Sequence, residues 1–237
     1  MWGAGPLTFE LRTADTEVQS RARAILGPWL VDAEPADPTG NDRSTIRFAI
    51  EAHGQGADRR WLVRDGARME PTTAASIDAA LTAVEYGAIA ELLAPDSGAA
   101  AVHAAILSQH GRGLLLAGPK EAGKTTLACA LWARGWTLHS DDNALVDAEG
   151  LARGIPRRVS LRAASREIVG DELWASVELL PGSTRTPAAL LFHPRMAELH
   201  ATDREPVRVA AVVFLGRSRA AGIGCVLQSI DPARGLI

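Results

Sequence analysis

The N-terminal part of the chain alternates between apolar and polar positions with the period of a β-strand. Residues 6–13 and 44–53 both place apolar side chains at every second position, which predicts two half-buried strands. Between them, residues 33–42 are rich in proline and acidic side chains, and this composition predicts a loop. Residues 59–70 carry Asp65-Gly66 between two extended halves, which predicts a β-hairpin.

The period then changes from that of a strand to that of a helix. Residues 73–93 repeat apolar side chains at i, i+4 and i+7, whereas Glu85 and other acids fall on the remaining faces. Pro95 and the turn residues 96–98 end this helix. The sequence therefore predicts a small N-terminal α+β lobe over residues 1–98, with strands, a hairpin and one helix.

From residue 99 onwards the chain alternates between strand and helix patterns, which is typical of an α/β domain. The predicted elements are two strands joined by a turn, a helix that Gly135 ends, two short extended pieces, a partly helical stretch, and two late strands. In order they span residues 100–108, 112–118, 123–134, 136–147, 163–177, 207–216 and 222–230. We therefore expect a mixed sheet in a second domain, residues 99–237.

The first of these helices follows a phosphate-loop motif. The stretch GPKEAGKT, Gly118 to Thr125, has the spacing G-x-x-x-x-G-K-[ST], directly after an apolar strand. In such loops successive backbone N–H groups and the start of the helix surround a phosphate. The predicted nucleotide-binding residues are Gly118, Pro119, Lys120, Glu121, Ala122, Gly123, Lys124, Thr125 and Thr126.

Two residues of this set have predicted chemical roles beyond the loop backbone. Lys124 is expected to reach the β- and γ-phosphates, and the hydroxyl of Thr125 to bind Mg²⁺. Lys120 and Glu121 occupy positions where the motif demands no particular residue. We interpret them as a solvated tip whose charges partly neutralise each other, with an extra phosphate contact from Lys120 as the alternative.

Two adjacent acids follow the loop. A strand that returns beside the loop strand after a short crossover would bring Asp141 and Asp142 near the phosphates. One carboxylate would then accept a proton from a hydroxyl and the other would hold the metal ion. Adjacent positions on a strand face opposite ways, so we expect the two to differ in role. The alternative is an exposed turn, because Asp-Asp-Asn is also common turn chemistry.

Composition limits the classes of function. The formal net charge is −3 over 237 residues, with a pI near 6.1, which gives no global reason to expect nucleic acid or an anionic membrane as a partner. No apolar stretch approaches the roughly 18–20 residues that cross a bilayer, and no leader pattern follows Met1, which predicts a cytoplasmic protein. The two cysteines, Cys129 and Cys225, are predicted to be buried, reduced thiols.

The stretch from His103 to Asp142 resembles the core of the HPr kinase/phosphorylase family. The shared features occur in the same order: His103, Gly111-Arg112-Gly113, the phosphate loop, Arg134-Gly135 and Asp141-Asp142. The resemblance implies a phosphate-loop kinase core of the HPr kinase and PEP carboxykinase type. It also implies ATP and Mg²⁺ as cofactors, and is compatible with a homo-oligomer, because the family is hexameric.

Carried over by position, the resemblance gives roles to individual residues. Asp141 matches the acid/base that deprotonates a serine hydroxyl, Asp142 a metal-site carboxylate, and His103 a histidine beside the phosphate pocket. Lys124 completes the catalytic set. Alone, a single histidine in an apolar run such as AAVHAAIL is more often part of a core.

The sequence after the aspartates differs from that family. RGIPRRVSLR at 153–162 stands where the family has Glu-x-Arg-Gly-x-Gly, so we expect a divergent relative. Some divergent relatives phosphorylate a serine of a precursor peptide, for example of a lasso peptide. Arg157, Arg158 and Arg162 either hold phosphate or an acidic substrate segment, with Arg157 and Arg158 favoured, or form a solvated basic face.

The remaining candidate residues carry weaker signals. Glu167 is a candidate second metal ligand, while His193 and His200 have no partner pattern and are predicted at the surface.

We therefore expect an ATP- and Mg²⁺-dependent kinase that acts on a serine of a protein or peptide, with neither nucleic acid nor membrane as partner. Two alternatives stay open: a small-molecule kinase on the same scaffold, and a non-catalytic nucleotide-binding module that regulates a partner. The sequence does not distinguish ATP from GTP.

Overall fold

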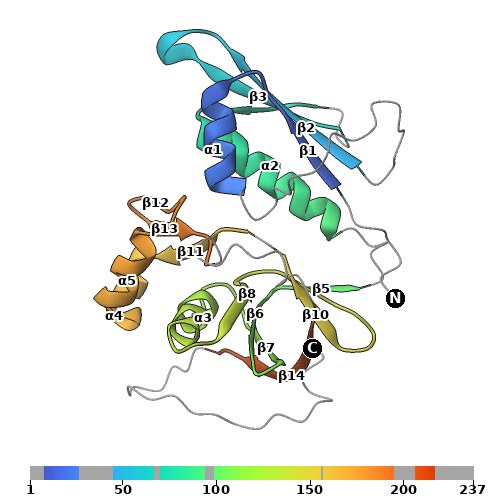
Figure 1. The fold of residues 1–237 in the computed structure, drawn as a ribbon, viewed down its shortest axis with the longest axis vertical. Coiled ribbons are helices and arrows are strands. Elements are labelled where there is room, and N and C mark those ends of the chain that lie inside the picture. The colour runs from blue at the N-terminus through green and yellow to red at the C-terminus, as the bar shows by residue number, and fades with distance from the viewer. Residues whose placement is uncertain are drawn as a thin grey trace.

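The computed structural model describes residues 8–26, 45–66, 70–93, 99–155, 157–194 and 206–216. The protein is a mixed α/β protein with a four-stranded N-terminal sheet, a seven-stranded mixed sheet and a three-stranded sheet (Figure 1). The predicted loop at 33–42, the predicted strand at 222–230 with Cys225, and His200 lie outside the described residues. The predicted domain boundary at 98 also falls in a stretch outside them.

The N-terminal sheet has the strand order β1-β2-β3-β4. Its strands are β1 (Thr8–Arg12), β2 (Thr45–His53), β3 (Arg60–Asp65) and β4 (Thr72–Ala74), with the 3₁₀ turn η2 (Gly56–Asp58) before β3. The predicted alternation is confirmed, because Phe48, Ile50 and Val63 are buried on one face. β3 and β4 pair as antiparallel neighbours, but β4 follows the predicted range of 59–70, and residues 67–69 lie outside the described residues.

Two helices cover the buried face of this sheet, where the sequence analysis predicted one. The missed helix is α1 (Thr16–Leu26), whose start is capped by Asp15 Oδ1 accepting from the Glu17 N–H. The predicted helix is α2 (Ile77–Leu92) and begins later than residue 73. Residues 72–74 pair as β4, and the Ser76 hydroxyl caps the helix by accepting from the Ala79 N–H.

The larger sheet has the order β5-β9-β10-β14-β7-β6-β8, in which β14 and β7 are parallel and the other neighbours are antiparallel. Its strands are β5 (Ala100–Val102), β6 (Ala104–Gln109), β7 (Arg112–Ala117), β8 (Thr137–Ser140), β9 (Ala144–Val146), β10 (Leu151–Gly154) and β14 (Val207–Phe214). The predicted single strand at 100–108 is divided at His103, where the chain passes from a pairing with β9 to pairings with β7 and β8.

The strand that carries the aspartates does not lie beside the loop strand, so that part of the prediction is wrong. β6 separates β7 from β8 and pairs antiparallel with both. Because β7 and β8 therefore run in the same direction, their carboxyl ends still meet at one edge of the sheet. The loop and the aspartates therefore lie close together as expected, although β6 lies between their strands.

One face of the large sheet packs on α3 (Lys124–Trp132) and on the third sheet, which has the order β11-β13-β12. The third sheet consists of β11 (Val159–Arg162), β12 (Thr184–Arg185) and β13 (Ala189–Phe192). The partly helical stretch is confirmed as η4 (Ala163–Ser165), α4 (Arg166–Val169) and α5 (Asp171–Glu178). Gly135, with a φ of 86°, ends α3 as predicted: its N–H donates to Trp132 and the Trp136 N–H to Leu131.

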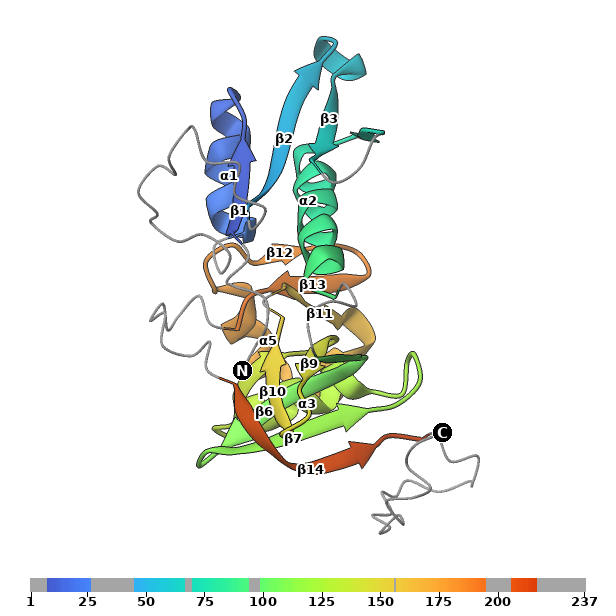
Figure 2. The same ribbon diagram turned by 90° about the vertical axis from the view of Figure 1, so that its right-hand side faces the viewer.

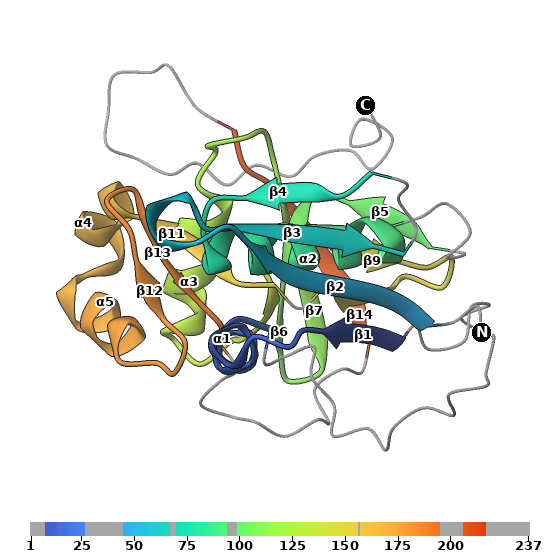
Figure 3. The ribbon, with the colours of Figure 1, turned by 90° about the horizontal axis from the view of Figure 1, so that it is seen from above.

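The third sheet lies between the N-terminal lobe and the large sheet, as Figure 2 shows. Seen from above, α4 and α5 group at one side of the molecule beside α3 (Figure 3). Cys129 of α3 is buried, as predicted, and burial raises the pKa of its thiol. Within the described part of the chain, no helix has the length and apolar character needed to cross a membrane.

Candidate functional site

The phosphate-loop motif occupies the strand–loop–helix context that the sequence predicts. β7 ends at Ala117, the loop follows, and α3 begins at Lys124. Gly118 has a φ of 150°, and a Cβ there would lie 2.5 Å from the carbonyl oxygen of Leu215. Gly123 has a φ of 97°, which favours glycine. Both motif glycines are therefore required by the backbone.

Lys124 lies across the loop. Its side chain is only 6% exposed, and Nζ donates to the carbonyl oxygens of Gly118 at 2.8 Å and Pro119 at 3.2 Å. The loop is further closed by the Ala122 N–H, which donates to Pro119. A buried ammonium that is held by neutral carbonyl groups keeps its charge available for an anion inside the loop.

Glu121 is the unusual member of the loop. Its φ is 68°, in the left-handed region that a side chain adopts at a cost of about 1–2 kcal/mol and that glycine adopts freely. The position therefore accepts a residue other than glycine, at a cost in backbone strain. Glu121 Oε1 also accepts from Arg162 Nη1 at 2.9 Å, so its charge is paired with an arginine that the sequence does not link to the loop.

Asp141 lies in the bend directly after β8 and touches the start of α3. Thr125 Oγ1 donates to Asp141 Oδ2 at 3.1 Å, and the Ser160 backbone N–H also bonds the carboxylate. The side chain is buried, and Oδ1 has no hydrogen-bond partner among the described residues. Burial raises the pKa of Asp141 from 3.8 to about 6, against the opposing effects of Arg157, Thr125 and Ser160.

Asp142 faces a different environment and is half-buried. Its Oδ1 lies 3.2 Å from His103 Nδ1, and its Oδ2 accepts from Arg157 Nη1 at 2.5 Å and from the Asn143 amide at 3.3 Å. The Ser140 hydroxyl accepts from the Asn143 N–H and so holds the turn. The two adjacent aspartates therefore differ in surroundings, as expected, although they lie in a turn and not on a strand.

Arg158 is buried and Arg157 is partly buried, so the interpretation as a solvated basic face is wrong for both. Arg157 reaches the aspartates, because it pairs with Asp142 while its guanidinium lies over the Tyr86 ring, 5.4 Å from the centroid. Arg158 turns the other way: its Nη2 donates to Thr82 Oγ1 at 2.9 Å and its backbone N–H donates to Glu85. Only the first of the two touches the predicted site.

The sequence analysis missed the contribution of α2 to this region. Tyr86 and Glu85 both contact the arginines after β10. Glu85, predicted on an exposed face, is 4% exposed, and burial raises its pKa despite the nearby arginines. Glu85 does not belong to the apolar face of the predicted helix, so the sequence gives no sign that it is buried. A charged side chain is expected to be exposed unless it has a known partner.

His193 was predicted at the surface and is instead 2% exposed. Its Nε2 donates to the carbonyl oxygen of Ile25 in α1 at 2.6 Å, which joins the segment after β13 to the N-terminal lobe. Burial lowers the pKa of His193 to about 4. Thr126, predicted as a nucleotide residue, bonds Ser165 through its hydroxyl at 2.8 Å, and Lys120 is exposed.

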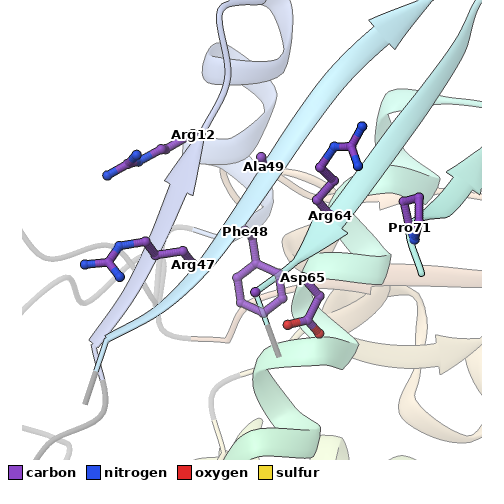
Figure 4. A pocket seen from close by; sticks show the side chains of 8 residues that line it. Arg12, Arg47, Phe48, Ala49, Arg64, Asp65 and Pro71 are labelled. Carbon is purple, nitrogen blue, oxygen red and sulfur yellow. The ribbon is translucent and has the colours of Figure 1, made fainter. Parts of the chain in front are cut away.

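A hollow of about 390 Å³ lies on the N-terminal sheet and not at the loop (Figure 4). Arg12, Arg47 and Arg64 line it, together with Phe48 and Asp65. These cations are already paired, because Arg12 and Arg47 both contact Glu10 and Arg64 lies 3.6 Å from Glu51. The chemistry of the hollow is therefore close to neutral, and the predicted site residues do not line it.

The residues at the loop fit a magnesium-bound triphosphate. The Thr125 hydroxyl and the half-buried carboxylate of Asp142 are hard oxygen donors for the ion. Oδ1 of Asp141, on the carboxylate that Thr125 contacts, is buried and has no partner among the described residues. Among the described residues, no group of three or more His, Cys, Asp or Glu side chains is arranged to hold a metal by itself. Mg²⁺ commonly binds through one or two carboxylates with waters and substrate phosphates completing the coordination.

Comparison of the chain with models of known protein families and with curated proteins found no match.

Proposed function

We propose that the protein is a nucleotide-dependent kinase with a phosphate-loop core of the HPr kinase and PEP carboxykinase type. The observation that carries this proposal is the contact between Asp141 and Thr125 of the loop, with a buried and unpartnered Oδ1 on the carboxylate. Phosphoryl transfer requires a held phosphate, a neutralising environment and a group that orients or deprotonates the acceptor. The site offers a residue for each.

Lys124 and the N–H groups that begin α3 hold the β- and γ-phosphates of ATP or GTP. Thr125 and Asp142 would hold Mg²⁺, which neutralises charge on the phosphate oxygens when bound. This leaves Oδ1 of Asp141 for the acceptor. His103 and Arg157 contact Asp142 and fix the direction of its carboxylate.

In the proposed step, Asp141 accepts the proton of the acceptor hydroxyl while the oxygen of that hydroxyl bonds to the γ-phosphorus. The bond between the γ-phosphorus and the bridging oxygen breaks, and the nucleoside diphosphate leaves. A pKa of about 6 leaves Asp141 ionised, and able to accept the proton, at neutral pH.

The acceptor rests on the resemblance of residues 103–142 to the HPr kinase family, which implies a serine hydroxyl of a protein or peptide. A ribosomal precursor peptide is the acceptor we favour, because the segment after the aspartates departs from the family signature. A small-molecule kinase and a non-catalytic module remain the competing functions. The buried proton acceptor opposes the second of these, since a non-catalytic module gains nothing from a destabilising carboxylate.

The test is transfer of label from γ-labelled ATP to a library of serine peptides and to HPr-like proteins, with the parent and Asp141→Asn side by side. We expect label in at least one acceptor and a loss of roughly 10²–10⁴-fold in rate for the variant. Equal rates for both would overturn the role of Asp141. Nucleotide binding without transfer to any peptide, protein or small-molecule hydroxyl would favour the non-catalytic module.

A further inference from the structure

The strand β11 presents an edge and a polar face to the phosphate loop. Val159 and Leu161 point into the core beneath α3 and are fully buried, whereas Ser160 and Arg162 alternate with them. β11 pairs with β13 along one edge, and the Ser160 N–H bonds Asp141. β11 is therefore already part of the wall of the candidate site.

Arg162 extends from this strand to the loop itself. Its guanidinium Nη1 lies 2.9 Å from Glu121 Oε1, and the side chains are 56% and 45% exposed. Exposed ion pairs of this kind contribute little to stability, so the pair opens at small cost. Arg162 can therefore leave Glu121 for a more highly charged partner without loss of a buried interaction.

The other arginines of this segment are not free to do this. Arg157 is held between Asp142 and Tyr86, and Arg158 between Glu85 and Thr82, both in largely buried positions. Of the three arginines at 157, 158 and 162, Arg162 is the one paired with a residue of the loop. This reverses the order of preference that the sequence suggests.

Glu121 is an acidic residue whose backbone is strained and whose side chain carries a negative charge within the loop. It lies within a loop whose N–H groups and lysine are arranged for an anion, and its backbone is left-handed with a φ of 68°. The Glu121 carboxylate at this position attracts a cation. The pair with Arg162 supplies that cation in the absence of a nucleotide.

We propose that Arg162 is a phosphate-binding residue of the nucleotide site, which Glu121 holds at the loop until the terminal phosphates replace it. A guanidinium presents a planar fork of donors that matches phosphate oxygens and keeps its charge at every pH of interest. When the nucleotide binds, the Arg162 guanidinium leaves the Glu121 carboxylate and contacts a phosphate. This inference rests on the proposed nucleotide-binding function.

The experiment measures the dissociation constants of ATP and ADP, each with Mg²⁺, for the full chain and four variants. These are Arg162→Gln, Glu121→Gln, the double variant Glu121→Gln/Arg162→Gln, and the control Arg185→Gln. Arg185 is a matched control, because it is an exposed arginine whose ion pair is with Glu178, away from the loop. Melting temperatures of all variants check that each chain is folded.

Arg162→Gln should weaken ATP binding about tenfold, because the terminal phosphates lose the guanidinium as a partner. ADP binding should weaken by a smaller factor, because ADP has no γ-phosphate for Arg162 to contact. Glu121→Gln should tighten ATP binding a few-fold in the parent and have no effect in the Arg162→Gln background. Arg185→Gln should bind both nucleotides as the parent does.

Three results would overturn the inference in different ways. Unchanged ATP binding by a folded Arg162→Gln chain shows that Arg162 does not contact phosphate. An effect of Glu121→Gln that persists without Arg162 shows that the two residues are not in competition with the nucleotide. A parent chain that binds none of ATP, ADP, GTP and GDP overturns the proposed function itself, and the inference with it.

Discussion

At the scale of single residues, the properties of Asp141 follow from where its two oxygens lie. One oxygen accepts from Thr125, while the other is buried without a partner among the described residues. An ionised carboxyl in that position loses water without gaining a full set of donors, and this raises its pKa to about 6. The same feature that makes the group a proton acceptor near neutral pH makes it a cost to the folded state.

Asp141→Asn should therefore stabilise the protein above pH 6 and leave it little changed at pH 4. A carboxyl whose pKa rises on folding from 3.8 to about 6 contributes stability that is full below pH 4 and is lost as the pH rises through 6. The variant does not lose stability in this way. Its free energy of unfolding should therefore exceed that of the parent by an amount that grows between pH 4 and pH 6 to roughly 2–3 kcal/mol. Urea unfolding of both chains at several values of pH measures the difference.

An advantage for Asp141→Asn that is the same at pH 4 and pH 8 would show that Asp141 does not titrate in this window. Asp147→Asn is the control, because Asp147 Oδ1 accepts from two backbone N–H groups of its own turn and lies outside the site.

At the scale of elements, α2 connects the N-terminal lobe to the site. Glu85 accepts from the Arg158 N–H and lies beside its guanidinium, and Tyr86 contacts Arg157. These contacts hold the segment between β10 and β11, which brings Arg157 to Asp142 on one side and Ser160 to Asp141 on the other. The helix α2 thus positions the aspartates indirectly, through its contacts with Arg157 and Arg158.

Glu85→Ala should destabilise the protein by about 3–5 kcal/mol, because it leaves Arg158 buried without its carboxylate. Thr82→Ala is the matched control on the same helix, since it removes one hydrogen bond to the same guanidinium and should cost about 1 kcal/mol. Denaturant unfolding at pH 7 measures both. A cost for Glu85→Ala no larger than that for Thr82→Ala would mean that the ion pair does not hold this segment.

The element patterns also show how far the sequence predicts the fold. The strands with clear alternation, the helix after the loop and the Gly135 cap are all found where the sequence predicts them. The helix α1 was missed because its buried face is short and lies among polar and charged residues; it consists of Val18, Ala22, Ile25 and Leu26. The strand order was wrong at β8 because strand pairing depends on contacts between distant segments, which local periodicity does not encode.

For the candidate site, local motifs named residues that the structure brings together. The loop and the aspartates are together in space, and His103 joins them through Asp142. Glu85, Tyr86 and the Glu121–Arg162 pair were not predicted, because each acts across a long separation in sequence. No spacing rule marks such partners before the topology is known.

At the scale of the whole molecule, polar contacts join the two lobes, and those of His193 and Arg158 are buried. His193, after β13, donates to Ile25 of α1, in addition to the contacts that α2 makes with Arg157 and Arg158. A polar group without its partner is costly when buried, so these contacts favour one relative placement of the lobes. The candidate site depends on that placement because Arg157 belongs to both the interface and the site.

The lobe contact at His193 should make the protein sensitive to acid. Burial lowers the pKa of His193 from 6.5 to about 4, so its contribution to stability is present above pH 6.5 and is lost as the pH falls through 4. His193→Gln keeps an N–H donor but does not titrate. Its unfolding free energy relative to the parent should therefore rise by roughly 2–3 kcal/mol between pH 7 and pH 4.

Urea unfolding in the same buffers provides the measurement, and His53→Gln, at an exposed histidine of β2, is the control. A difference between His193→Gln and the parent that does not change with pH would contradict a neutral, buried His193 at the lobe interface.

The central claim is that the loop from Gly118 to Thr125 holds the phosphates of a nucleotide through Lys124. The most direct test is the dissociation constant of Mg-ATP for the parent, for Lys124→Met and for Lys120→Met, an exposed lysine in the same loop. We expect the parent to bind, Lys124→Met to bind at least about tenfold more weakly, and Lys120→Met to bind within about threefold of the parent. A folded parent chain that binds neither Mg-ATP nor Mg-GTP, or equal losses for the two lysine variants, would contradict the account.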